Sequence, residues 1–133
     1  MKRYILLLVV MLFLPFAYAW DIVFDFQPHS SPLEAGAIEV NESLTYTPLI
    51  GYGWSASLLG SRDRGVGNNL ERDLVFDSSD RYFYVDLPNG RYLLSIGLGD
   101  MKCKHDCVYV DVEAGPWDVR NATTLAGEVK WFN

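Results

Sequence analysis

Flat aromatic rings and planar charged side chains occur close together between residues 52 and 72. Proteins recognise sugars with this combination, because an aromatic ring covers the apolar face of the sugar while guanidinium, carboxylate and amide groups bond its hydroxyls. The segment therefore predicts a carbohydrate-binding site. Its candidate contact residues are Tyr52, Trp54, Arg62, Asp63, Arg64 and Asn68.

Each of these residues also has a structural interpretation. Trp54 could belong to the hydrophobic core, and the Arg and Asp side chains could form ion pairs at the surface or at strand ends. Arg72 and Asp73 enter an expected strand, so we expect them to be mainly structural. Both interpretations of the segment stay open from the sequence.

No catalytic set accompanies the segment. Nucleophilic catalysis needs a serine or cysteine beside a histidine that a carboxylate orients. His29 and His105 both lie in expected loops, and the serines next to His29 would point away from it on an extended chain. We therefore expect a binding protein rather than an enzyme.

The two cysteines, Cys103 and Cys107, are separated by three residues. In an exported chain an even pair favours a disulfide, which here would close a very small loop at the tip of a hairpin. The alternative is a metal site formed by both cysteines and His105, with Asp100 or Asp106 as the remaining ligand. Since structural zinc normally has four strong ligands, we expect the disulfide.

The first 19 residues have the features of a secretory signal peptide. Lys2 and Arg3 precede an apolar run that ends in the small-x-small pattern Ala17-Tyr18-Ala19. The run is short for a membrane anchor, and Pro15 interrupts it. We expect one domain at residues 20–133, secreted or at the cell surface, with no membrane contact after cleavage of the signal.

The chain after the expected cleavage site is strongly acidic. It holds nine Lys and Arg residues against 17 Asp and Glu residues, a net charge of −8. Nucleic-acid binding needs clustered basic residues, so we exclude it, whereas neutral sugars or calcium remain compatible with this charge. Asn41-Glu-Ser43 and Asn121-Ala-Thr123 match the N-glycosylation tripeptide, which also occurs by chance. The sequence gives no oligomeric state.

Alternating apolar and polar residues between turn signals predict an all-β chain. The strongest pattern is Arg81–Asp100, where two alternating runs flank Pro88-Asn89-Gly90 and predict two consecutive strands with a tight turn. Ser55–Asn69 is polar and rich in glycine, which predicts a long loop. Strands at this spacing indicate an antiparallel β-sandwich or jelly roll. The other expected strands are Trp20–Phe26, Ala37–Val40, Leu44–Thr47, Arg72–Phe76, Cys107–Glu113, Trp117–Thr124 and Glu128–Phe132.

An ordered series of short motifs covers most of residues 22–131. The motifs are Asp25-Phe26, Gly51-Tyr52-Gly53-Trp54, Arg62-Asp63-Arg64, Arg72–Phe76, Phe83–Tyr92, Gly99-Asp100 and Val110–Gly115. In order and spacing they resemble the galactose-binding-like β-sandwich that accompanies rhamnogalacturonan acetylesterase-like and rhamnogalacturonan lyase-like enzymes. In that family further strand sequence follows the segment matching Ala126–Phe132. We therefore expect a jelly roll that lacks its final strand, either as part of a longer protein or as a domain with an open sheet edge.

The resemblance also implies a function. It implies a secreted, non-catalytic module that binds polysaccharide of the pectin or rhamnogalacturonan type beside a degrading enzyme. Related modules often hold a structural calcium ion between the first and the final strand, and Asp25 matches the first-strand side; no cofactor is required otherwise. The alternative is a structural or adhesion module whose open sheet edge makes protein contacts.

Overall fold

The computed structural model describes residues 21–113 and 119–133, apart from the side chains of Cys107 and Arg120. The expected signal peptide lies outside these ranges. All regular secondary structure within these ranges is β-strand, which confirms the all-β prediction. The same ranges contain no helix that is long and apolar enough to cross a membrane. The strands are β1 (Phe24–Phe26), β2 (Ile38–Val40), β3 (Tyr52–Trp54), β4 (Gly60–Asp63), β5 (Asp73–Phe76), β6 (Phe83–Val85), β7 (Ile96–Asp100), β8 (His105–Val110), β9 (Val119–Thr124) and β10 (Glu128–Phe132).

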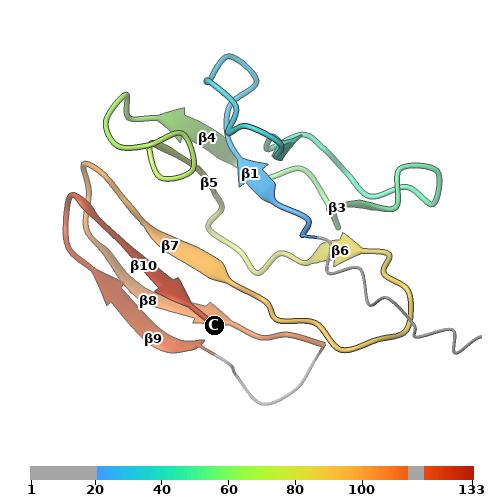
Figure 1. Cartoon of the computed structure of the whole chain (residues 1–133). Helices are drawn as coiled ribbons and strands as arrows, with labels where there is room; N and C mark the ends of the chain where they lie inside the picture. Colours follow the sequence, from blue (N-terminus) through green and yellow to red (C-terminus); the bar gives the residue numbers. More distant parts are fainter. Residues whose placement is uncertain (1–20, 114–118) are drawn as a thin grey trace, which may run out of the picture.

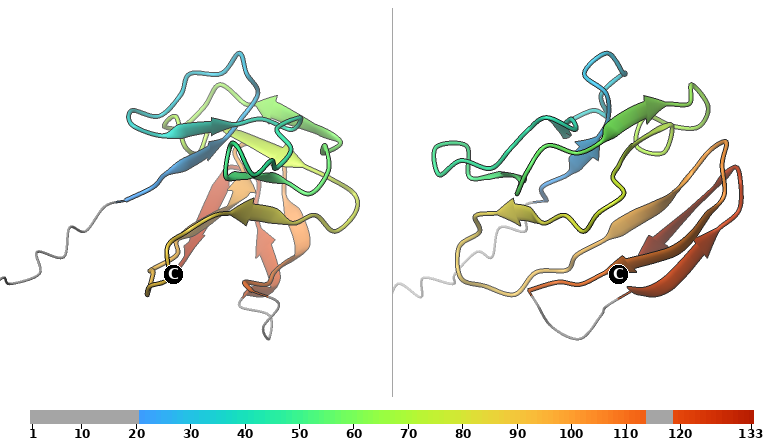
Figure 2. Two further views of the ribbon diagram at one scale, coloured as in Figure 1. Left: turned by 90° about the vertical axis from the view of Figure 1, so that its right-hand side faces the viewer. Right: turned by 180° about the vertical axis from the view of Figure 1, so that it is seen from behind.

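The strands pair two by two. β3 pairs with β6, β4 with β5, β7 with β10 and β8 with β9, all antiparallel, whereas β1 and β2 are parallel. β7 to β10 lie together on one side of the molecule and β1 to β6 on the other (Figures 1 and 2). The parallel β1–β2 pair departs from the expected antiparallel arrangement. The jelly-roll topology stays a prediction.

The two consecutive strands predicted within residues 81–100 are present as β6 and β7, but each pairs with another strand. β6 pairs with β3, and β7 pairs with β10. The ring of Phe83 on β6 packs 5.0 Å from that of Phe26, so aromatic contacts hold β6 beside β3. Between β6 and β7 the chain bends at Asn89 and Gly90, and the hydroxyl of Tyr92 donates to the carbonyl oxygen of Pro88 at 2.5 Å. Residues 86–95 connect β6 to β7, so the connection is longer than the predicted tight turn.

β4 lies inside the segment expected to be a loop. It pairs with β5 in a register that sets Gly60 opposite Phe76 and Asp63 opposite Asp73. The strand has no apolar side chain, so alternation gave no signal for it. Its contact with the next strand is made instead by Arg62, whose guanidinium carbon lies 4.8 Å from the centre of the Phe76 ring.

Aromatic rings form much of the interior between β1, β3 and β6. Such rings prefer tilted or edge-to-face contacts, and the pairs here have centroids 5.0 to 6.5 Å apart. Among the described residues the buried aliphatic side chains are Val40, which is fully buried, and Val119 and Ala122, which are nearly so. The aromatic cluster consists of Phe24, Phe26, Tyr52, Trp54 and Phe83.

Gly53 allows the segment before β3 to pass close to that strand. Its φ is +139°, and a Cβ there would lie 2.5 Å from the backbone nitrogen of Tyr46. That nitrogen donates to the carbonyl oxygen of Trp54 at 2.9 Å, and Thr45 forms an isolated bridge with the same residue. A glycine within a strand often marks such a close approach of another backbone segment, and Gly53 is an example.

Candidate functional site: a polar pocket beside Asp100

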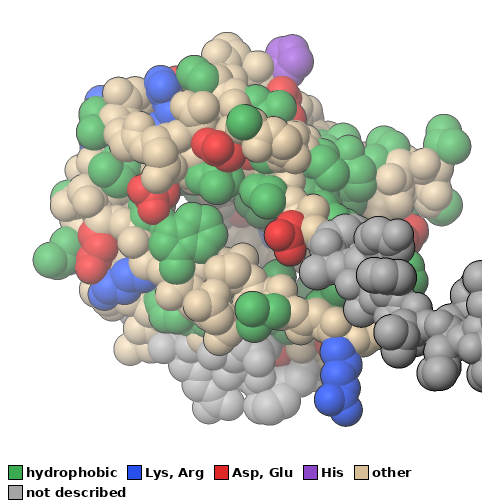
Figure 3. Space-filling view, viewed as in Figure 1, with side chains coloured by type: hydrophobic (Ala, Val, Ile, Leu, Met, Phe, Trp, Pro, Cys, Tyr) green, Lys and Arg blue, Asp and Glu red, His purple; other side chains and the backbone are tan. Residues whose placement is uncertain are grey.

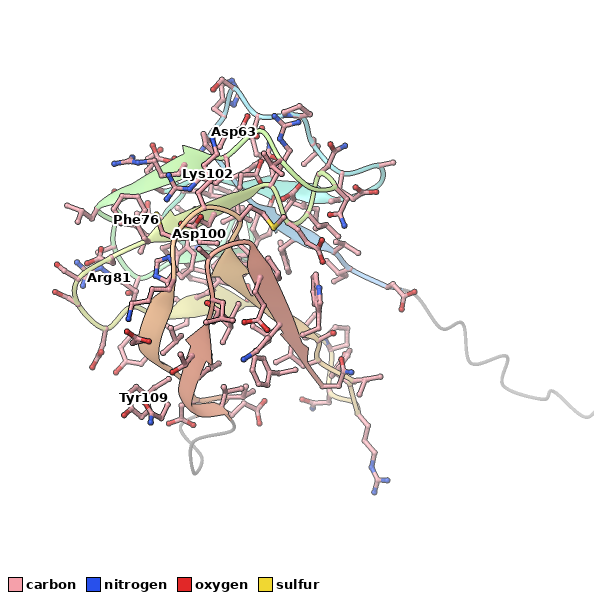
Figure 4. All side chains as sticks on the ribbon, turned by 90° about the vertical axis from the view of Figure 1, so that its left-hand side faces the viewer. Asp63, Phe76, Arg81, Asp100, Lys102 and Tyr109 are labelled. Carbon is pink, nitrogen blue, oxygen red and sulfur yellow. The ribbon has the colours of Figure 1, made fainter. Side chains whose placement is uncertain are left out.

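A pocket of about 350 Å³ lies between the β4–β5 ribbon and the loop that follows β7. This volume is near the lower end of small-ligand pockets, which span roughly 300 to 1,000 Å³. Figure 4 shows Phe76, Asp100 and Asp63 toward the same end of the molecule, with Tyr109 at the other. The lining combines charged groups with an apolar wall: Arg62, Arg64, Leu74, Phe76, Asp77, Asp100, Cys103 and His105.

Asp100 anchors the chain at the pocket. Its side chain is 1% exposed and accepts hydrogen bonds from Arg64 Nε at 2.9 Å and Nη2 at 2.6 Å. The backbone N–H groups of Lys102 and Cys103 donate to it at 2.7 and 3.2 Å, and His105 Nε2 lies at 3.2 Å. Burial by itself would raise the pKa of this carboxyl, but these hydrogen bonds outweigh it and hold the pKa well below its usual value.

Arg62 and Arg64 differ in how many of their N–H donors are already hydrogen-bonded within the protein. Arg64 is bound to Asp100 through two nitrogens, and this hydrogen bonding raises its pKa further. Arg62 forms no ion pair with any residue that the structure describes, and its Nη1 donates to the carbonyl oxygen of Ser61 at 2.7 Å. Arg62 therefore keeps N–H donors at the pocket that a ligand can use.

Two other predicted residues stabilise the chain between β4 and β5. Asp63 accepts hydrogen bonds from Arg72 Nε at 3.0 Å and Nη2 at 2.9 Å, and the pair lowers the pKa of Asp63. Asn68 bonds Glu71 twice: its Nδ2 donates to Oε2 at 2.8 Å, and its Oδ1 accepts from the backbone nitrogen at 3.0 Å. Neither Asp63 nor Asn68 lines the pocket.

The predicted aromatic contacts, Tyr52 and Trp54, lie in the aromatic cluster and do not line the pocket. The Trp54 ring packs 5.4 Å from Phe26 and 5.0 Å from Phe83, and its Nε1 is buried without a hydrogen-bond partner. Tyr52 packs 5.2 Å from Phe24. This geometry supports the core interpretation of Trp54, so the structure brings together Arg62 and Arg64 from the predicted set.

Three tyrosines outside the predicted set gather around β6, and Tyr82 and Tyr84 are 65% and 46% exposed. The rings of Tyr82 and Tyr84 are 6.3 Å apart and nearly parallel, at 13°. Tyr46 stands edge-on to Tyr84 at 5.6 Å, and its hydroxyl donates to Asp86 at 3.1 Å. Because Phe83 points inward, alternation along the strand sends both neighbours outward, and this was the signal available in the sequence. We call Tyr46, Tyr82 and Tyr84 the tyrosine face.

The cysteine predictions gain no support. Cys103 is a free, exposed cysteine, and the side chain of Cys107 lies outside the described residues, so the disulfide is not supported. Cys103 Sγ lies 3.6 Å from Arg64 Nη2, and His105 bonds Asp100, so these contacts do not form a nucleophile–base pair. Within the described ranges, no group of three or more His, Cys, Asp or Glu side chains is arranged to hold a metal.

Asp25, which the resemblance associates with calcium, is 1% exposed on β1. Its Oδ2 accepts a hydrogen bond from the backbone nitrogen of Glu34 at 2.9 Å, while its Oδ1 is buried and has no partner. Asp73 on β5 likewise has a buried Oδ1 without a partner. Burial raises the pKa of both carboxyls, to about 6 for Asp73. Calcium is bound by such oxygens, so these residues fit the ion.

The structure thus defines an all-β protein with a polar, arginine-containing pocket. Over 82 residues the chain is 38% identical to β-agarase A of Zobellia galactanivorans, and this similarity covers 58% of the chain. The matched part is 15% of that protein, so the chain spans a small share of its length. No family model and no solved structure match the chain.

Proposed function

We propose that the chain is a secreted, non-catalytic carbohydrate-binding module that assists a polysaccharide-degrading enzyme. The observation that carries the proposal is the position of Arg62. Its guanidinium has no ion-pair partner among the described residues and lies over the Phe76 ring at the pocket. The partial similarity to an agarase supports a role with polysaccharides. The motif series supports a galactose-binding-like jelly roll as the scaffold.

The chemistry of the pocket suits a sugar with free hydroxyls. A guanidinium can donate to two neighbouring hydroxyls at once, and the planar group fixes their orientation. The Arg64–Asp100 pair supplies a rigid polar wall, because its hydrogen bonds are already made. The net charge of −8 after signal removal disfavours a polyanionic ligand, so an uncharged galactan such as agarose fits better than acidic pectin.

The Arg62→Ala variant tests the pocket. We expect its affinity for agarose oligosaccharides to fall at least about tenfold, because charge-assisted hydrogen bonds are lost, while loss of the contact with Phe76 lowers the free energy of unfolding by only about 1 kcal/mol. Isothermal titration and affinity electrophoresis in agarose and in rhamnogalacturonan gels would measure this. Arg91→Ala is the matched control, because Arg91 is exposed and does not line the pocket. Equal binding by both variants, or cleavage of the polymer by the purified chain, would contradict the proposal.

The tyrosine face gives a second prediction about polymer binding. An exposed aromatic ring can cover the apolar face of a sugar, and Tyr82 and Tyr84 expose much of their surface. We expect Tyr82→Ala to weaken binding of long chains roughly threefold to tenfold but to leave binding of a disaccharide in the pocket unchanged. Tyr82→Phe keeps the ring and should bind like the wild type. Equal effects of the Ala and Phe variants would count against stacking.

A protein-contact module is the second candidate, and exposed apolar side chains favour it. Leu49, Leu59 and Leu93 are 96%, 67% and 87% exposed, and Figure 3 shows hydrophobic side chains at several separate places on one face, among polar and charged ones. Such groups on a protein surface can mark sites of association. Light scattering on the purified chain would separate the candidates, since self-association through this surface gives a concentration-dependent mass and a sugar-binding monomer does not.

A further inference from the structure

Three side-chain oxygens between β1 and β5 are buried and have no hydrogen-bond partner. They are Asp25 Oδ1, Gln27 Oε1 and Asp73 Oδ1, from residues that are 1%, 0% and 7% exposed. A buried polar atom without a partner is costly, so a native protein normally supplies a water molecule or an ion for it. β1 and β5 contact each other, so one partner between them can serve these three oxygens.

The hydrogen bonds around these oxygens tie their residues into one cluster. Gln27 Nε2 donates to the carbonyl oxygen of Ser31 at 3.2 Å, and the Ser31 hydroxyl donates to Asp73 Oδ2. The backbone nitrogen of Glu34 donates to Asp25 Oδ2. Each carboxylate is therefore held through Oδ2 and keeps Oδ1 free, and the Gln27 amide is held through its nitrogen and keeps its oxygen free.

The cluster is rich in negative charge. Asp25 and Asp73 lie within electrostatic reach of each other, Glu34 and Glu39 add to the field at Asp25, and Asp63 adds to it at Asp73. The nearby cation is Arg72, and its guanidinium is hydrogen-bonded to Asp63. Two buried carboxylates in such a field are unstable as anions unless a cation joins them.

We propose that Asp25, Gln27 and Asp73 bind a calcium ion between β1 and β5. Two carboxylates and one amide oxygen are hard ligands, and calcium accepts six to eight oxygens in a flexible arrangement, so water and backbone carbonyls can complete the set. Zinc and copper prefer nitrogen and sulfur ligands, which the cluster does not contain. This site lies at β5, in the middle of the chain, and not at the final strand to which the family resemblance points.

The ion would connect the first strand to the strand that carries part of the pocket wall. β5 contributes Leu74 and Phe76 to the pocket, and Phe76 lies beneath Arg62. Calcium would thereby stabilise the β1–β5 contact without touching the sugar. The inference does not depend on the proposed sugar binding, and it can hold if that function is wrong.

Calcium titration of the full chain, after removal of metals by chelation, tests the site. We expect the unfolding temperature to rise at least about 5 °C when calcium reaches about 100 times its dissociation constant, because the ion binds the folded state. Terbium, a luminescent substitute for calcium, should show emission on excitation of tryptophan, since Trp54 packs against Phe26 beside Asp25. Magnesium should have a smaller effect, because it demands shorter, octahedral contacts.

The variant Asp73→Asn separates a metal ligand from a structural residue. It should weaken calcium binding at least about tenfold and abolish the calcium-dependent rise in unfolding temperature. Without calcium it should be at least as stable as the wild type, because it removes repulsion with Asp25, whereas loss of a merely structural residue would destabilise it. Asp111→Asn, at an exposed position, should keep the full calcium response. The proposal is overturned if calcium leaves the unfolding temperature of the wild type unchanged, as it would if water fills the cluster. It is also overturned if Asp73→Asn keeps the full calcium response.

Discussion

Replacing Asp100 by asparagine should lower the free energy of unfolding by about 3 kcal/mol or more. The substitution leaves Arg64 without its counter-charge and turns an amide N–H₂ toward a guanidinium that offers only donors. Urea denaturation would measure the change. The control is Asp106→Asn on the following strand, β8, where an exposed pair with Lys104 at 3.1 Å should be worth about 1 kcal/mol at most. Similar losses in both variants would contradict a special role for Asp100.

The same carboxylate should contribute to acid unfolding. The pKa of Asp100 is lower in the folded state than in the unfolded chain, so the unfolded state binds more protons in acid. Its contribution is therefore present above the unfolded pKa of about 3.9 and is lost as the pH falls below about 4. The Asp100→Asn variant should lose less stability than the wild type between about pH 5 and pH 2. Parallel stability curves for the two proteins would show that Asp100 is not the group responsible.

Gly53→Ala should destabilise the fold by at least about 3 kcal/mol and disturb the tyrosine face. The new Cβ would lie 2.5 Å from the Tyr46 nitrogen and 2.6 Å from the Thr45 carbonyl carbon, and backbone atoms cannot rotate away as a side chain can. The φ of +139° adds strain for any residue with a Cβ. Tyr46 should then lose its contact with Tyr84, so binding of long polysaccharide should fall together with stability.

Gly90→Ala is the matched control for this substitution. A Cβ at Gly90 would meet the Tyr92 hydroxyl at 3.4 Å, the end of a flexible side chain, and its φ lies outside the left-handed region. We expect a change within about 1 kcal/mol. Thermal unfolding followed by circular dichroism compares the two variants. If Gly53→Ala were as mild as Gly90→Ala, the close approach of the two backbones would not be needed for folding.

The sequence by itself determined the all-β class, several of the strands and the chemistry available. Alternation located β10 at Glu128–Phe132 with the bounds the structure has, and it placed β5 and β9 within their expected segments. Alternation works locally, because a strand with one buried face must place apolar residues at every second position. It failed for β4, whose contact with β5 is made by the polar residue Arg62 rather than by an apolar side chain.

Tertiary structure alone decided which strands pair and which polar groups keep free hydrogen-bond donors for a ligand. The pattern around Pro88 predicts two consecutive strands but not their partners, and β6 joins β3, where the ring of Phe83 packs against that of Phe26. Arg62 and Arg64 are two residues apart and chemically identical, yet Arg64 is bound to Asp100 and Arg62 keeps free donors. That difference depends on a carboxylate 36 residues away from Arg64 in the chain, and local patterns carry no information on contacts at such separations.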